Sequence, residues 1–172
     1  MSALSEEDEI IAFEKSVSFL ESIGIKVHFK NIDTDCFLPG LTIENGQIIV
    51  DKQKMKYPGD ILHEGGHIAV VPAAERNSLS EHSIANREQK DAEEMMAIAW
   101  SYAACIHIGI DAGFVFHDNG YKGGGSNIAD NFKQGKYFGV PMLQWTGMAL
   151  EKKSDTAPDQ PVYPVMLQWL RN

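Results

Sequence analysis

The chain has 172 residues, of which 44% are hydrophobic, and its formal net charge is −9. Such a length and composition are typical of one globular domain with a sizeable core, so we expect residues 1–172 to form a single domain. The acidic balance, with no clustered stripe of Lys and Arg, argues against a nucleic acid or an anionic membrane as partner.

The sequence also indicates where the protein resides. No stretch approaches the roughly 20 apolar residues that span a bilayer, and residues 1–9 are acidic where a signal peptide would be basic. Cys36 and Cys105 are too few for a disulfide framework, and they lack CxxC spacing. We therefore expect a cytoplasmic protein, with Cys105 in the core.

The first part of the chain predicts a helix, a strand and a hairpin. Ser5 is a suitable N-cap, and apolar residues then recur at helical spacing. Asn45-Gly46 between two apolar runs is a strong hairpin signal. The predicted elements are a helix over 5–23, a half-buried strand over 25–30 and hairpin strands over 41–43 and 47–50.

Residues 63–67 read His-Glu-Gly-Gly-His, a complete HExxH motif. On a helix, residues four apart share a face, so His63 and His67 can bind one metal ion. Glu64 would then lie beside the ion and take a proton from a metal-bound water whose pKa is lowered toward about 7. The alternative is a structural helix that carries two histidines and no metal.

The flanks of the motif support a helix. Pro58 suits its first turn, Asp60 complements the helix dipole, and Pro72 ends it. Gly65 and Gly66 each cost about 1 kcal/mol relative to alanine inside a helix. We therefore expect a substrate strand or a neighbouring helix to approach the backbone closely at these glycines.

The rest of the chain is predicted to contain a second long helix and several short elements. The long helix begins charged and becomes apolar, as expected of a central helix. The predicted order is a polar connection over 73–87, the long helix over 87–107, a strand over 114–116, a glycine-rich loop over 117–125 and a short helix over 126–135.

Catalytic zinc takes three protein ligands, so a third ligand has to lie downstream of the motif. Asp91, Glu93 and Glu94 open the long helix, and a carboxylate on an apolar helix needs a partner if it is buried. Glu94 is preferred to Glu93, because the residue one turn later is the small Ala97. The alternative is that all three acids are solvated partners of the helix dipole.

The loop that begins at His117 offers an imidazole and, at Tyr121, a phenol. Both are donor types that stabilise an oxyanion opposite a metal, so both are candidate catalytic residues. The alternative is a plain turn, since Asp118, Asn119 and Gly120 are typical turn residues.

The order of these parts, over roughly residues 5–107, resembles the ImmA/IrrE-like minimal gluzincins, which are compact zinc metallopeptidase domains. The resemblance implies that His63 and His67 are zinc ligands and that Glu64 is the general base. It also implies Glu94, or else Glu93, as the third ligand. Two glycines in the motif depart from the family's usual larger residues, and residues 108–172 match nothing in it.

Taken together, the sequence predicts an α+β domain of zincin type, with a small sheet packed against the HExxH helix and the long acid-bearing helix. Its core would cover residues 5–107, followed by a glycine-rich extension over 108–172. The predicted function is zinc-dependent hydrolysis of a peptide or protein substrate. The alternative is a zincin-like metal-binding protein without turnover that binds a regulatory partner. The sequence does not indicate the oligomeric state.

Overall fold

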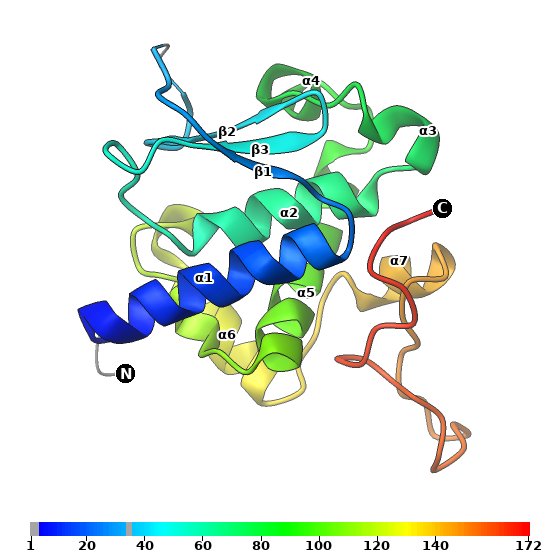
Figure 1. Ribbon diagram of the computed structural model, residues 1–172. Helices are drawn as coiled ribbons and strands as arrows, with labels where there is room; N and C mark the ends of the chain where they lie inside the picture. The colour runs from blue at the N-terminus through cyan, green and yellow to red at the C-terminus, as the bar shows by residue number, and fades with distance from the viewer. Residues whose placement is uncertain (1–3, 34–35) are drawn as a thin grey trace.

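The computed structural model describes residues 4–33 and 36–172 (Figure 1). In chain order the helices are α1 (Glu6–Ser22), α2 (Asp60–Val70), α3 (Ala73–Arg76), α4 (Glu81–Ala85), α5 (Lys90–Ile108), α6 (Gly125–Lys133) and α7 (Val140–Trp145). The strands are β1 (Val27–Phe29), β2 (Leu41–Glu44) and β3 (Gln47–Val50). None of the described helices is long and apolar enough to cross a membrane.

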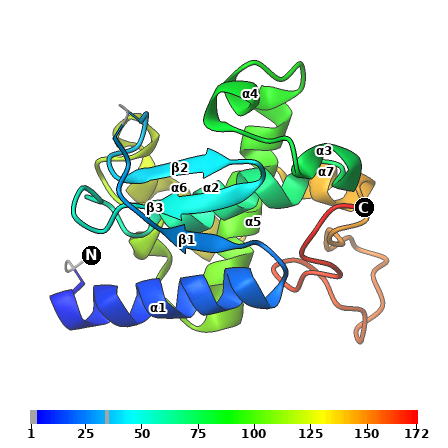
Figure 2. The ribbon, with the colours of Figure 1, turned by 45° about the horizontal axis from the view of Figure 1, so that its top comes forward.

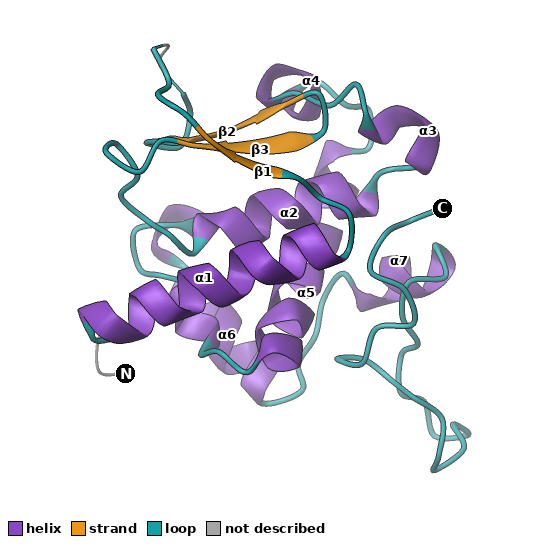
Figure 3. Ribbon diagram, in the orientation of Figure 1, coloured by secondary structure: helices purple, strands orange, loops and turns teal. Residues whose placement is uncertain are grey.

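The fold is of the mixed α+β class, with one small sheet in the order β1-β3-β2 (Figure 3). β1 runs parallel to β3, and β2 pairs antiparallel to β3. The predicted hairpin is confirmed: Asn45 and Gly46 have φ values of 51° and 69°, the left-handed pair that a tight hairpin turn needs.

Helix α2 lies at the centre of the molecule. The sheet covers one of its faces, while α1 and, most extensively, α5 pack against the others (Figures 1 and 2). Its apolar side chains are almost fully buried, and each such leucine or isoleucine stabilises the fold by about 1.5–3 kcal/mol. The helix that carries HExxH is therefore held rigidly on three sides.

The two motif glycines allow this close packing. A Cβ on Gly65 would lie 2.4 Å from the Leu20 side chain of α1. A Cβ on Gly66 would lie 2.9 Å from the carbonyl oxygen of Ala97 on α5. The expected close approach is thus made by neighbouring helices.

Residues 108–172 add to the same buried cluster as residues 5–107. Phe116 and Phe132 are fully enclosed in it. The last residues return along α5 and the end of α2: Trp100 Nε1 donates to the Trp169 carbonyl at 2.9 Å, and the Arg171 amide donates to the Ala69 carbonyl at 2.9 Å. These contacts join parts of the C-terminal third to α5 and to the end of α2.

Two local predictions were wrong, and a third element is present but shorter than predicted. The strand over 114–116 is absent, because the Asp111 carboxylate accepts from the Gly113 amide at 2.7 Å and caps a 3-10 turn, Ala112–Phe114. The connection over 73–87 contains α3 and α4, and reciprocal hydrogen bonds between Ser80 and Ser83 cap α4. The strand over 25–30 is shortened to β1.

Candidate metal centre

The HExxH helix forms where the sequence predicts it and brings its two histidines together. His63 and His67 lie one turn apart on α2, with their Nε2 atoms 3.1 Å apart. Their rings meet edge to face, with centroids 4.6 Å apart. Both side chains are largely buried, 13% and 12% exposed, so neither ring is free to turn away from the other.

Helix α5 supplies a carboxylate to the same point. Glu94 places Oε1 3.4 Å from His63 Nε2 and Oε2 3.2 Å from His67 Nε2. His63, His67 and Glu94 are the one group among the described residues whose ligand atoms lie close enough together to hold a metal ion. The Glu94 side chain is 43% exposed, so solvent reaches the cluster from the α5 side.

The spacing of the two histidine nitrogens is compatible with one shared ion. Ligands about 2.0–2.1 Å from a tetrahedral zinc lie about 3.3 Å from one another. The two Nε2 atoms are 3.1 Å apart, which is close to that value, while the carboxylate contacts of 3.4 and 3.2 Å are made by its two different oxygens. Two imidazoles and one carboxylate are also a donor set that zinc accepts at catalytic sites, where a fourth position stays open.

The neighbouring acid, Glu93, does not join the cluster. Its carboxylate is buried, 4% exposed, and accepts two hydrogen bonds from Arg87, at 2.6 and 2.9 Å. Arg87 also pairs with Glu75 at 2.8 Å. The Glu93 carboxylate is thus paired with a guanidinium and is not directed at the histidines. Asp91 is exposed, so Glu94 is the one of the three acids that faces His63 and His67.

The electrostatics of the metal-free cluster reflect these contacts. Burial acts to raise the pKa of Glu94, but hydrogen bonds from His63 and His67 outweigh it and hold that pKa well below its usual range. Burial acts to lower the pKa of His67, but the Glu94 hydrogen bond and the charges of nearby carboxylates raise it overall.

Glu64 lies beside the ligands without being one of them. Burial raises the pKa of its carboxyl group, and the charges of His67 and His63 offset that rise only in part. A carboxyl group with a raised pKa has a higher proton affinity than an exposed one, and general-base chemistry can use that affinity.

Tyr121 borders the cluster from the glycine-rich loop. Its ring meets the His63 ring edge to face, with centroids 5.4 Å apart. Its hydroxyl is buried and has no hydrogen-bond partner among the described residues, and burial raises its pKa well above the usual value. Tyr121 and Lys122 have φ values of 53° and 56°, a conformation that costs about 1–2 kcal/mol for such residues. A protonated phenol is thus held in strained backbone beside His63.

His117 is held by two residues that the sequence reading did not connect with it. Its Nε2 lies 2.9 Å from the Asp60 carboxylate, and its ring stacks on Tyr57 with centroids 4.5 Å apart. Asp60 begins α2, three residues before His63. Asp60 lies on the same helix face as the HExxH motif, and this spacing could have indicated that it belongs to the site. From the sequence, Asp60 was interpreted only as a partner of the helix dipole.

Two glycines of the loop over 117–125 have a packing role. A Cβ on Gly125 would lie 2.4 Å from the His117 carbonyl oxygen, and one on Gly120 would lie 3.2 Å from the His117 ring. Their small size lets the loop fold closely around His117. The loop thereby carries both His117 and Tyr121 to the side of α2.

Comparison with known proteins provides no family assignment: no protein-family model, curated protein or solved structure matches the chain. The function has therefore to be argued from the geometry of the site.

Proposed function

We propose that this protein is a zinc-dependent hydrolase of the HExxH type that cleaves a peptide bond. The observation that carries the proposal is the convergence of His63, His67 and Glu94, with Glu64 next to them on α2. Bound zinc would polarise a carbonyl group and lower the pKa of water. The three ligands would leave a coordination position open for that chemistry.

In this proposal Glu64 accepts the proton of the attacking water and delivers it to the leaving nitrogen. Its place on α2 directly after the ligand His63 suits this transfer, because the carboxylate lies beside the position where the water would be held. Glu64 is not required for metal binding, since the ligand set is complete without it. Its role can therefore be separated experimentally from that of the ligands.

Tyr121 is the better of the two predicted oxyanion donors. Its hydroxyl keeps its proton and has no other acceptor among the described residues. His117 engages Asp60 through Nε2, so its free Nδ1 can donate only when the ring is protonated. We assign Tyr121 to the developing oxyanion, while His117 and Asp60 support the loop that carries it.

The resemblance to the ImmA/IrrE-like gluzincins is consistent with this proposal. The order of a helix, a strand, a hairpin, the HExxH helix and an acid-bearing helix is present in α1 to α5. That order alone does not define a substrate.

The test is turnover of a mixed peptide library by the zinc-loaded chain, followed by mass spectrometry. Glu64→Gln is expected to lose about 10²–10⁴-fold of the cleavage rate while retaining its zinc, because only proton transfer is removed. Equal cleavage by both proteins would contradict the assignment of Glu64. Zinc binding without any cleavage by the wild type would instead favour a metal-binding module without turnover.

A further inference from the structure

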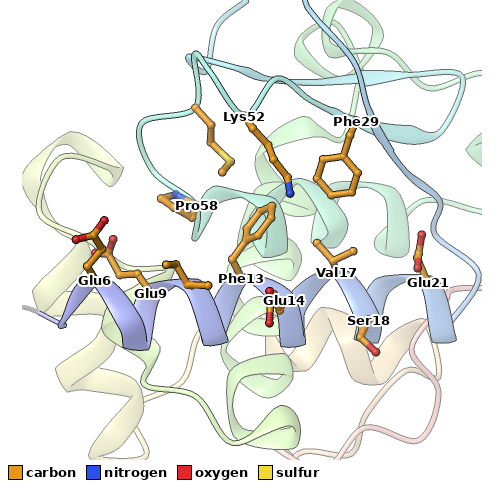
Figure 4. A pocket seen from close by; sticks show the side chains of 12 residues that line it. Glu6, Glu9, Phe13, Glu14, Val17, Ser18, Glu21, Phe29, Lys52 and Pro58 are labelled. Carbon is orange, nitrogen blue, oxygen red and sulfur yellow. The ribbon is translucent and has the colours of Figure 1, made fainter.

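A groove lies along α1, away from the metal ligands. It has a volume of about 500 Å³ and runs between α1, β1 and the segment that leads into α2 (Figure 4). None of His63, His67 and Glu94 lines it. Its volume is within the range of about 300–1,000 Å³ that is usual for binding pockets.

The walls of the groove are apolar and partly open to solvent. Phe13 and Phe29 meet edge to face, with ring centroids 6.4 Å apart, and the Phe29 side of the pair is 48% exposed. Ile10, which also lines the groove, is 54% exposed. Exposed apolar side chains gathered at one hollow, rather than scattered singly, are typical of an interaction surface.

The rim of the groove is acidic. Glu6, Glu9, Glu14 and Glu21 from α1 all line it, and Figure 4 shows them along this helix. Lys52 is the one cation among the lining residues, and its ammonium lies 4.5 Å above the Phe29 ring. A ligand with basic side chains is therefore attracted, and an acidic one is repelled.

Among the described residues, the edge of β1 that borders the groove pairs with no other strand. β1 pairs with β3 through residues 26, 28 and 30, as shown by the bonds from the Ile48 amide to the Lys26 carbonyl and from the Lys30 amide to the Val50 carbonyl. In a parallel pair the intervening residues point the other way, so the N–H and C=O groups of Val27 and Phe29 face away from β3. β1 is an edge strand of the sheet.

We propose that this groove binds an extended segment of a partner protein in which apolar and basic side chains alternate. The segment adds to the free edge of β1 as a further strand. Its apolar side chains enter the groove beside Phe13 and Phe29, and its lysines or arginines meet the glutamates of α1. A second copy of this chain is disfavoured as occupant, because each copy has a net charge of −9 and brings the same acidic helix.

The test uses a short fluorescein-labelled peptide of alternating valine and lysine, with binding to the full chain followed by fluorescence anisotropy. Glu14→Lys is expected to weaken binding about tenfold or more, because it reverses a charge on the rim. Glu88→Lys is the matched control, because it makes the same change at an exposed residue that does not line the groove. Phe29→Asp should also weaken binding, and circular dichroism verifies that each variant is folded.

Two further peptides test the mode of binding. A valine–glutamate peptide should bind more weakly, because it lacks the positive charge that the glutamates of α1 attract. A valine–lysine peptide methylated on alternate backbone nitrogens should also bind more weakly, because it cannot pair with β1 as a strand. Slower hydrogen exchange of the Val27 and Phe29 amides on binding would support pairing at β1. Equal binding of all three peptides, equal effects of Glu14→Lys and Glu88→Lys, or no binding of the basic peptide would overturn the proposal.

Two controls separate this inference from neighbouring explanations. Peptide binding should be unchanged in Glu64→Gln and after treatment with a chelator, so failure of the hydrolase proposal would leave it standing. Sedimentation equilibrium reports self-association. A dimer that Phe29→Asp dissociates would assign the groove to a second copy of the chain and contradict the partner proposal.

Discussion

Two adjacent acids at the start of α5 have different environments, although they have the same side chain. Glu93 is buried and bound by Arg87, while Glu94 is half-exposed and faces His63 and His67. A carboxylate held by a permanently charged guanidinium in the interior has a structural partner. A carboxylate that converges with two imidazoles instead completes a ligand set. We therefore propose that the first acid stabilises the fold and the second binds metal.

Replacing the two acids in turn should have its largest difference in effect on the affinity for zinc. Glu94→Ala removes one of three ligands, so zinc should bind at least about 100-fold more weakly, a larger loss than is usual when an outer-shell partner is removed. Isothermal titration with zinc measures this. Glu93→Ala is the matched control and should change the affinity little, whereas equal losses in the two variants would contradict the separation of roles.

A smaller effect, in which the order of the two variants is reversed, is expected on the stability of the metal-free protein. Glu93→Ala leaves the largely buried Arg87 with only its Glu75 partner and should destabilise the fold by about 1–3 kcal/mol. For a chain of this length that corresponds to a melting temperature lower by several degrees. Thermal unfolding in chelator measures it. Glu94→Ala removes the histidine contacts that lower the Glu94 pKa, but its side chain is 43% exposed, so under the same conditions it should lower the melting temperature less than Glu93→Ala does. A larger loss in Glu94→Ala would reverse our assignment.

The smallest effect concerns the spacing of α2 and α5, on which the position of Glu94 depends. Gly66→Ala puts a methyl group 2.9 Å from the Ala97 carbonyl oxygen, at a cost of about 1–3 kcal/mol, partly offset by the better helix propensity of alanine, about 1 kcal/mol. We expect a net destabilisation of about 1 kcal/mol, together with weaker zinc binding. Chemical denaturation and zinc titration of this variant measure both effects. A more stable variant with unchanged zinc affinity would show that the helices do not need this contact.

Local sequence patterns predicted the parts of the site that lie within one helix. The spacing of His63 and His67 follows from helical geometry, and the cost of Gly65 and Gly66 correctly indicated close packing. The different roles of Glu93 and Glu94 depend on where Arg87 lies in the fold, which the sequence does not show. The small size of Ala97 favoured Glu94 as the third ligand only indirectly. The apolar run over 114–116 suggested a strand, but a local hydrogen bond from the Gly113 amide to Asp111 favoured a 3-10 turn.

Features that join distant segments could not be read from the sequence. Asp60 and His117 are far apart in the chain, and only the folded loop over 117–125 brings them within hydrogen-bonding distance. The groove along α1 similarly depends on packing between α1 and the end of β1, which no local pattern encodes. Local periodicity predicts which residues of one helix or strand lie on the same face. Only tertiary contacts determine which side chains of different elements meet.

The most direct test of the metal centre is a crystal structure of the chain grown with zinc, with anomalous diffraction recorded on both sides of the zinc absorption edge. We predict one strong peak, bonded at about 2.0–2.2 Å to Nε2 of His63, Nε2 of His67 and a carboxylate oxygen of Glu94. A peak coordinated by Glu93 instead, or no peak between α2 and α5 at saturating zinc, would contradict the assignment.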